Sequence, residues 1–98
     1  MAGIDRSSGG GVDPILSLIL RKLETAKRYP RMARKMGIEG TAVVRFKLKP
    51  EGGLEAVEIV NSSGSEILDK ASLETVHAAA PLPYKEGWLK VGIVFKIF

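Results

Sequence analysis

The stretch RYPRMARKMGIEG, at residues 28–40, decides the fold expected for this chain. Pro30 ends the preceding helix, because the residue before a proline avoids the helical region of backbone space. A short basic helical segment over residues 30–36 follows, and Gly37 can close it in the left-handed conformation. Gly40 then leads into an alternating strand. Because no residue of the stretch is suited to acid–base or nucleophilic chemistry, we interpret it as part of a binding module.

Length and composition indicate one small domain. A chain of 98 residues buries only about 60–65% of its unfolded surface, so the expected core is modest. Hydrophobic residues make up 45% of the sequence, but no apolar run approaches the roughly 18 residues that a membrane-spanning helix needs. The absence of cysteine excludes disulfides and leaves the cellular compartment open.

The formal charge of +4 is unevenly distributed. Between residues 21 and 35, Glu24 is the only acidic residue. The basic residues of this segment are Arg21, Lys22, Lys27, Arg28, Arg31, Arg34 and Lys35. A basic face of this kind indicates either an acidic or anionic partner or an ordinary solvated helix face.

Residues 1–12 are rich in Gly and Ser and show no periodicity. We interpret them as a flexible linker or as sequence added for expression, and place the domain at residues 13–98. The basic and apolar regions of a signal peptide are missing from this end. If the native protein acts outside the cytoplasm, the chain is therefore a fragment that has lost its targeting segment.

A first helix is predicted from Asp13, which can cap it, with Pro14 at the first helical position. Its expected apolar face consists of Ile15, Leu18, Ile19, Leu23 and Ala26. Leu16 and Leu20 widen this face, so the helix is expected to pack on the domain or on another copy of the chain.

Two strands then form a predicted hairpin. Residues 41–49 alternate, with Val44, Phe46 and Leu48 on one face. A turn over residues 50–53 leads into a strand over residues 54–60, with Val57 and Ile59 directed inward.

A second helix, over residues 66–79, is expected to start with a capping box formed by Ser63 and Glu66. Small and apolar residues along one face suit close packing on a sheet: Leu68, Ala71, Ser72, Thr75, Val76 and Ala79. The last strand is predicted over residues 89–98. Its inward residues are Leu89, Val91, Ile93, Phe95 and Ile97. Trp88 is expected to anchor the start of this strand in the core.

The predicted fold class is α+β: a three-stranded antiparallel sheet of order 2-1-3, a helix packed on one face and an N-terminal helical segment. A hairpin followed by a right-handed crossover gives this order. The last strand then lies at an edge and offers unpaired backbone groups to an extended peptide. Gly92 leaves room there for a close backbone approach.

The residues quoted above carry a family resemblance. The segment from Tyr29 to Arg34, followed by Gly37 to Phe46, resembles the opening of the TonB C-terminal domain. The turn at residues 50–53, the strand around Val57, the small-residue helix and the closing residues 93–97 follow in the family's order. The resemblance covers about residues 22–98. Residues 79–83 depart from family members with an aromatic and basic helix end and resemble a branch rich in proline at this point.

The resemblance implies a periplasmic domain of a protein anchored in the inner membrane, which transmits work derived from the proton-motive force for uptake of nutrients such as siderophores, iron or cobalamin. Its partner is the TonB box of outer-membrane transporters, added as a strand beside the last strand. ExbB and ExbD would engage the missing N-terminal part. The implied contacts are Arg28, Tyr29, Pro30, Arg31, Val91, Gly92, Ile93, Val94, Phe95, Lys96 and Ile97. Packing on the sheet is an alternative role for Tyr29.

Other functions are weighed against this hypothesis. A TolA-like envelope-integrity domain shares the layout, and a small RNA-binding module would fit the pI near 9.6. Against RNA, Phe46 and Phe95 are expected in the core, which leaves no stacking platform. No enzyme activity, metal, cofactor or nucleic acid is predicted, since His77 lacks co-ligands and the serines at 62, 63 and 65 lack a base. A homodimer formed by strand or helix exchange stays an alternative.

Overall fold

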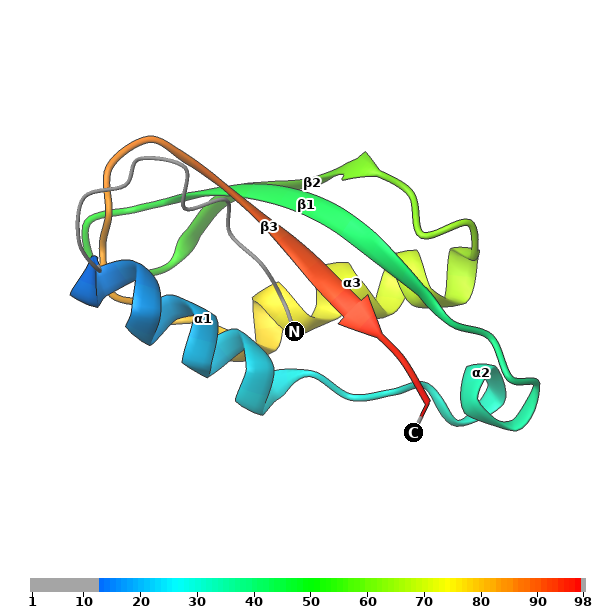
Figure 1. The fold of residues 1–98 in the computed structure, drawn as a ribbon. Coiled ribbons are helices and arrows are strands. Elements are labelled where there is room, and N and C mark those ends of the chain that lie inside the picture. Colours follow the sequence, from blue (N-terminus) through cyan, green and yellow to red (C-terminus); the bar gives the residue numbers. More distant parts are fainter. Residues whose placement is uncertain (1–12, 98) are drawn as a thin grey trace.

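Two helices cover the same face of a three-stranded sheet in the computed structural model, which describes residues 13–97 (Figure 1). The sheet is antiparallel with the order β2-β1-β3, and its helices α1 and α3 lie side by side beneath it. The elements are α1 (Pro14–Ala26), α2 (Arg31–Lys35), β1 (Gly40–Leu48), β2 (Leu54–Asn61), α3 (Glu66–Ala79) and β3 (Trp88–Phe95). The predicted fold class and strand order are confirmed. Residues 1–12 and Phe98, which the sequence assigned to a linker and to the last strand, lie outside the described residues.

The capping of α1 follows the sequence, but its buried face is rotated from the predicted one. Asp13 accepts the N–H of Ile15 at 2.9 Å, and Pro14 occupies the first helical position. The residues that pack against the core are Leu16, Ile19, Leu20, Leu23 and Ala26. Ile15 and Leu18 are exposed, so their assignment to the buried face was wrong. The reason is that α1 packs against α3 and the shared core, and the 16, 19, 20, 23 spacing presents one continuous stripe to them.

The hairpin of β1 and β2 forms as predicted. Val44, Phe46 and Leu48 are buried, and Val57 and Ile59 pack against them at the edge of the core. In the turn, Lys49 donates its N–H to Gly53 and accepts that of Gly52, both at 2.8 Å. Gly52 has a positive φ of 96° and accepts the Leu82 N–H at 2.9 Å, which ties the turn to the loop after α3.

The predicted capping box of α3 was wrong by two residues. Ser65 is the N-cap and accepts the Leu68 N–H. Ser63 instead donates its hydroxyl and its N–H to Asp69, each at 2.7 Å. Ser65, two positions nearer the helix, has the correct cap geometry. Asp69 accepts hydrogen bonds from Ser62 and Ser63 and so fixes the chain between β2 and α3. The small-residue stripe of α3 is buried as predicted.

Strand β3 differs from its prediction at both ends. It stops at Phe95, so Lys96 and Ile97 lie beyond the strand. The reason is that Phe95 is opposite Gly40, the first residue of β1, and the Glu39 side chain takes the next position by accepting the Ile97 N–H at 2.7 Å. Trp88 is 46% exposed rather than buried. Since successive residues of a strand face opposite sides, the burial of Leu89 places Trp88 on the open face.

Candidate functional site

The outer side of β3 is an open edge in the part of the chain that the structure describes. Among the described strands β3 pairs only with β1, because the order β2-β1-β3 places it last, so its other side has no neighbouring strand. Directly after β1, Lys49 donates its N–H to Gly53 and accepts that of Gly52, so the odd-numbered residues of β1 direct their backbone groups toward β2. The even-numbered residues of β1 therefore face β3. The register then leaves Trp88, Lys90, Gly92 and Val94 with their N–H and C=O groups pointing away from the sheet.

Only alternate residues of the predicted edge thus offer backbone groups to a partner. Val91, Ile93 and Phe95 lie opposite even-numbered residues of β1, and their side chains are each 1% exposed. They hold the strand in place rather than face a ligand. Lys90 was missing from the predicted contacts, although its outward position follows from the strand period.

One outward carbonyl of this edge is bonded by a side chain of the same chain. Lys27 donates from Nζ to the Val94 carbonyl oxygen at 2.7 Å. The same Nζ lies 5.9 Å from the centre of the Phe95 ring and 3.1 Å from a Glu24 carboxylate oxygen. Lys27 was not predicted as an edge contact.

Tyr29 packs beneath the end of β3. Its ring meets the Phe95 ring edge-on, with centroids 5.5 Å apart and planes at 84°. Its hydroxyl donates a hydrogen bond to the Ile38 carbonyl, just before β1. Desolvation raises the pKa of the Tyr29 phenol above its ordinary value, and the nearby Glu39 carboxylate adds to this shift. Tyr29 therefore joins the segment after α1 to both β3 and the approach to β1.

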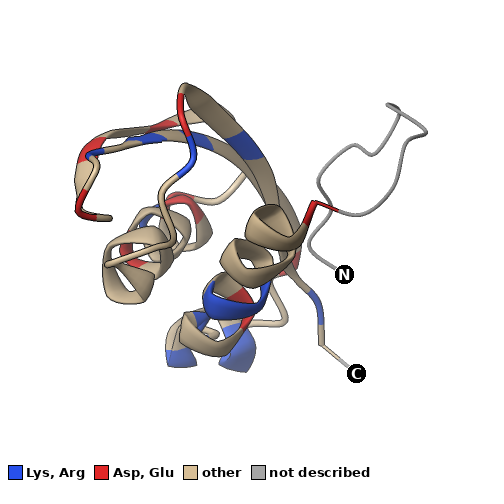
Figure 2. Ribbon diagram, turned by 90° about the vertical axis from the view of Figure 1, so that its left-hand side faces the viewer, with Lys and Arg blue, Asp and Glu red and all other residues tan. Residues whose placement is uncertain are grey.

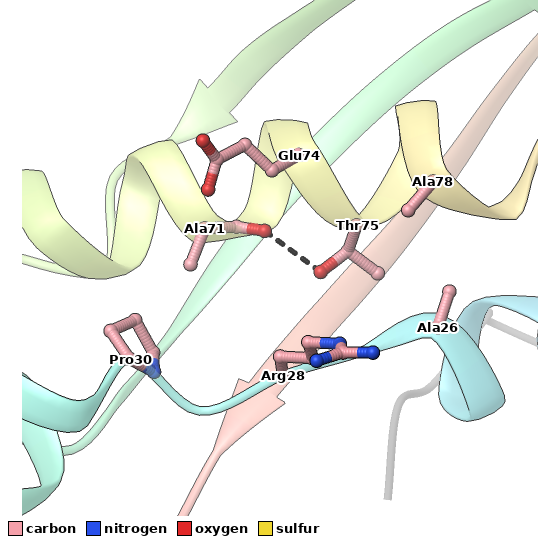
Figure 3. A pocket seen from close by; sticks show the side chains of 7 residues that line it. All are labelled: Ala26, Arg28, Pro30, Ala71, Glu74, Thr75 and Ala78. Atoms are coloured by element: carbon pink, nitrogen blue, oxygen red, sulfur yellow. Dashed lines mark hydrogen bonds between the residues drawn. The ribbon is translucent and has the colours of Figure 1, made fainter.

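The other residues of the Arg28–Arg31 segment face a different part of the molecule. Arg28 and Pro30 line a cavity of about 210 Å³ between this segment and α3. Figure 3 shows the Arg28 side chain lying along the gap between the segment and α3, close to Thr75. Thr75 itself is satisfied, because its hydroxyl donates to the Ala71 carbonyl at 2.8 Å. Arg31 is exposed at the start of α2. Of the four predicted contacts in this segment, the structure brings Tyr29 to β3, while Arg28 and Pro30 face α3.

The charge of α1 changes along its length. Its first half is uncharged, whereas its second half carries Arg21, Lys22 and the acidic Glu24 (Figure 2). The exposed cations continue through Arg28, Arg31 and Arg34. This surface lies next to the helix end from which Lys27 reaches β3.

The open face of the sheet holds an aromatic residue that the sequence interpretation placed in the core. The Arg45 guanidinium lies 4.5 Å from the centre of the Trp88 ring and forms an ion pair with Glu58. Phe46 and Phe95 are buried, as predicted. In residues 13–97 no group of three metal-binding side chains comes together, and none of the helices there is long and apolar enough to cross a bilayer.

These features define a class of small α+β domain with a core-anchored edge strand suited to backbone pairing. Residues 25–97 match the family described as the Gram-negative bacterial TonB protein C-terminal domain. The chain belongs to this family, and the resemblance drawn from the Tyr29–Phe46 region is confirmed.

Relatives and solved structures agree with this assignment. A TonB protein of Helicobacter pylori (strain ATCC 700392 / 26695) is 35% identical over 85 residues, which cover 80% of this chain and 30% of that protein. A TonB protein of Pasteurella multocida is 39% identical over 71 residues, covering 72% of this chain and 28% of that protein. The solution structure of a Helicobacter pylori TonB C-terminal domain has a TM-score of 0.79 and 30% identity, covering 93% of this chain and 88% of that one. The chain thus spans less than a third of the length of these two relatives.

A further solved structure shares the fold alone. The third domain of TolA, bound to a peptide from the N-terminus of TolB, has a TM-score of 0.70 and 16% identity, covering 92% of this chain and 80% of that one.

Proposed function

We propose that this domain couples energy to transport in the periplasm by binding the TonB box of outer-membrane transporters. The rest of the protein would anchor it in the inner membrane, where ExbB and ExbD supply work derived from the proton-motive force. The transported nutrients would be of the siderophore, iron or cobalamin type. The domain itself, at residues 13–98, acts as a binding and force-transmitting module and not as an enzyme.

The open edge of β3 is the observation that carries the proposal. An added strand needs a row of backbone groups spaced along one side, and Lys90, Gly92 and Val94 provide it. Gly92 has no side chain on the open face, so a guest backbone can approach closely. The alternating residues Val91, Ile93 and Phe95 are buried, which fixes the strand against sideways movement while the guest is bound.

The segment before β1 contributes next to this edge. Tyr29 positions the end of β3 through its contact with Phe95, and we assign to Arg28, Pro30 and Arg31 flanking contacts with residues of the transporter outside the box. Lys96 and Ile97 follow directly after the strand. Their cationic and apolar side chains suit the part of the guest that leaves the sheet.

The expected affinity is moderate. Backbone hydrogen bonds contribute about 0.5–1.5 kcal/mol each, so four to six of them sum to a few kcal/mol. Ordering a disordered peptide costs about 2–5 kcal/mol. Side-chain contacts must supply the difference, and a Kd in the micromolar range, about −8 kcal/mol, is expected.

Amide chemical shifts of the labelled domain, followed during titration with a synthetic TonB-box peptide, test the proposal. We expect shifts at Lys90, Gly92 and Val94 and in the Arg28–Arg31 segment, with none along β2. A scrambled peptide is the control. A TolB N-terminal peptide tests the TolA-like alternative, and an oligonucleotide tests RNA binding, which would weaken steeply with salt. A saturating TonB-box peptide that leaves β3 unshifted would rule the proposal out.

A second copy of the chain is the competing occupant of the same edge. Strand or helix exchange would make the β3 amide shifts depend on protein concentration without peptide. Sedimentation equilibrium over the concentrations used for the titration separates this case from peptide binding.

A further inference from the structure

The bond from Lys27 to Val94 occupies one of the acceptors that strand addition would use. Val94 is the outward-facing residue nearest the end of β3, since the strand stops at Phe95. A guest strand pairing along the whole edge would donate an N–H to its carbonyl. The Lys27 ammonium already lies 2.7 Å from this oxygen.

Lys27 is held at this position from both sides. It is the C-cap of α1, and its own N–H donates to the Leu23 carbonyl at 3.0 Å. Two residues later, Tyr29 packs against Phe95 and bonds Ile38, so the backbone around Lys27 is constrained in both directions.

The side chain of Lys27 is also well placed for a strong bond. It is 22% exposed, and its ammonium contacts both Glu24 and the face of Phe95. A hydrogen bond from a charged donor is roughly twice as strong as one from a neutral amide. A guest N–H is therefore a weaker donor to the Val94 carbonyl than the group already bonded to it.

We propose that Lys27 sets the register of strand addition by occupying the Val94 carbonyl, which restricts pairing of the guest's N–H groups to the outward carbonyls nearer the start of β3, those of Trp88, Lys90 and Gly92. This inference rests on the proposed function, because it assigns a positioning residue to the same site. The Lys27 ammonium donates the hydrogen bond that the last N–H of a guest strand would otherwise donate to Val94. A guest pairing farther toward Ile97 would have to displace it.

Removing single N–H groups from the guest tests this directly. A set of TonB-box peptides is made, each N-methylated at one residue, and the Kd of each is measured with the wild-type domain and with Lys27→Met. In the wild type, methylation weakens binding at the residues opposite Lys90 and Gly92 and has no effect at the residue opposite Val94. In Lys27→Met, that residue also becomes sensitive. The unmethylated peptide binds about two- to tenfold more tightly to this variant, the gain from one additional backbone hydrogen bond.

Methionine keeps an unbranched apolar side chain while removing the donor, so the fold should be retained. Lys22→Met is the matched control, because it removes the same charge from α1 on a side chain that lines the α3 side of the helix. It should bind like the wild type. Lys27→Arg restores a charged donor and should return the wild-type pattern.

Two results would overturn the inference while leaving strand addition intact: identical methylation patterns in the wild type and Lys27→Met, or weaker binding of the unmethylated peptide to Lys27→Met. If Lys27→Met does not fold, the wild-type pattern still decides, because sensitivity at the residue opposite Val94 contradicts the inference. If the unmethylated peptide binds neither protein, strand addition itself is wrong, and the proposed role of Lys27 is then wrong as well.

Discussion

The two edge strands of the sheet, β2 and β3, are both eight residues long, yet they are held in different ways. β3 buries Leu89, Val91, Ile93 and Phe95, whereas no residue of β2 is fully buried. Helix α3 packs beneath β1 and β2, while α1 and Tyr29 lie at the β3 side. An edge strand can thus expose its backbone to a partner and still be fixed by its side chains. In this domain that combination occurs at β3.

The ends of the two strands also differ in chemistry. The end of β3 is held by aromatic contact between Tyr29 and Phe95 and by the Lys27 bond. The end of β2 is held by Asp69, which accepts hydrogen bonds from Ser62 and Ser63. One end therefore depends on apolar packing and the other on an ionised carboxylate, so they should respond differently to mutation and to pH.

Matched isoleucine truncations should give the largest contrast. Ile93→Ala in β3 removes a side chain that is 1% exposed, and we expect it to lower the free energy of unfolding by about 2–5 kcal/mol. Ile59→Ala in β2 removes a partly buried side chain and should cost less than half as much, because less area is lost from the core. Urea unfolding measures both. Equal losses would mean that the strands are anchored alike.

Removing the Tyr29 hydroxyl should have a smaller effect at the β3 end. Tyr29→Phe keeps the ring contact with Phe95 but loses the bond to Ile38, so thermal unfolding should shift down by less than in Ile93→Ala. The raised pKa of Tyr29 means that the folded state holds this proton more tightly than the unfolded state. The protonated phenol therefore stabilises the fold fully below its ordinary pKa of 10.0, and this stabilisation is lost as pH rises toward the folded pKa.

A thermal-melt series between pH 8 and pH 11 checks this sign. The difference in melting temperature between wild type and Tyr29→Phe should decrease as pH rises past 10.0. A difference that increased with pH would contradict the conclusion that burial raises the pKa of Tyr29.

Asp69 should make the β2 end sensitive to acid. Burial by itself would raise the pKa of this carboxyl, but the hydrogen bonds from Ser62 and Ser63 outweigh it and lower the pKa below 3.8. The bonds therefore stabilise the fold above this pH, and the stabilisation is lost as pH falls through the folded pKa. Asp69→Asn should cost about 1 kcal/mol at pH 7 and progressively less in acid.

Amide hydrogen exchange locates the acid effect. Lowering the pH should reduce protection at the end of β2 and the start of α3 before it reduces protection at Ile93 and Phe95, once intrinsic exchange rates are corrected. If protection were lost at the same pH in β2 and β3, the two edges would not differ in their sensitivity to acid.

The smallest effect is expected where β1 links the two edges. Arg45 contacts Trp88 of β3 and Glu58 of β2. Double-mutant cycles should give a coupling of about 0.5–1 kcal/mol for Arg45 with Trp88, and about 0.2–1 kcal/mol for Arg45 with the exposed Glu58. In 1 M salt the coupling to Glu58 should fall more, because exposed ion pairs are screened. A coupling to Trp88 that vanished in salt would indicate that ring contact contributes little.

Alternation and turn chemistry made much of this fold predictable. The period of two in β1 and β3 identified the buried residues Val44, Phe46 and Ile93 from their own segments. Pro30 and Gly37 marked the boundaries of α2, because proline fixes its own φ and glycine readily adopts the positive φ found after this helix. The last strand could be assigned to an edge from connection rules alone.

The errors arose where several local solutions were equally good. Both Ser63 and Ser65 can cap a helix, and only the path of the chain from β2 selects Ser65. Ile15 and Leu18 are as apolar as Leu16 and Leu20, and only the positions of α3 and the sheet decide which pair is covered. Trp88 was assigned by its hydrophobicity, although the position of Leu89 in the strand determines its side.

The sequence by itself determined the family, the element order and the existence of an edge strand, because these depend on patterns within short segments. Which backbone groups of that edge face outward, and which of them is already bonded, was decided only by the tertiary structure. Lys27 and Val94 are 67 residues apart, and no local pattern relates them. Their contact exists because α1 ends beneath the same strand that Tyr29 and Phe95 hold in place.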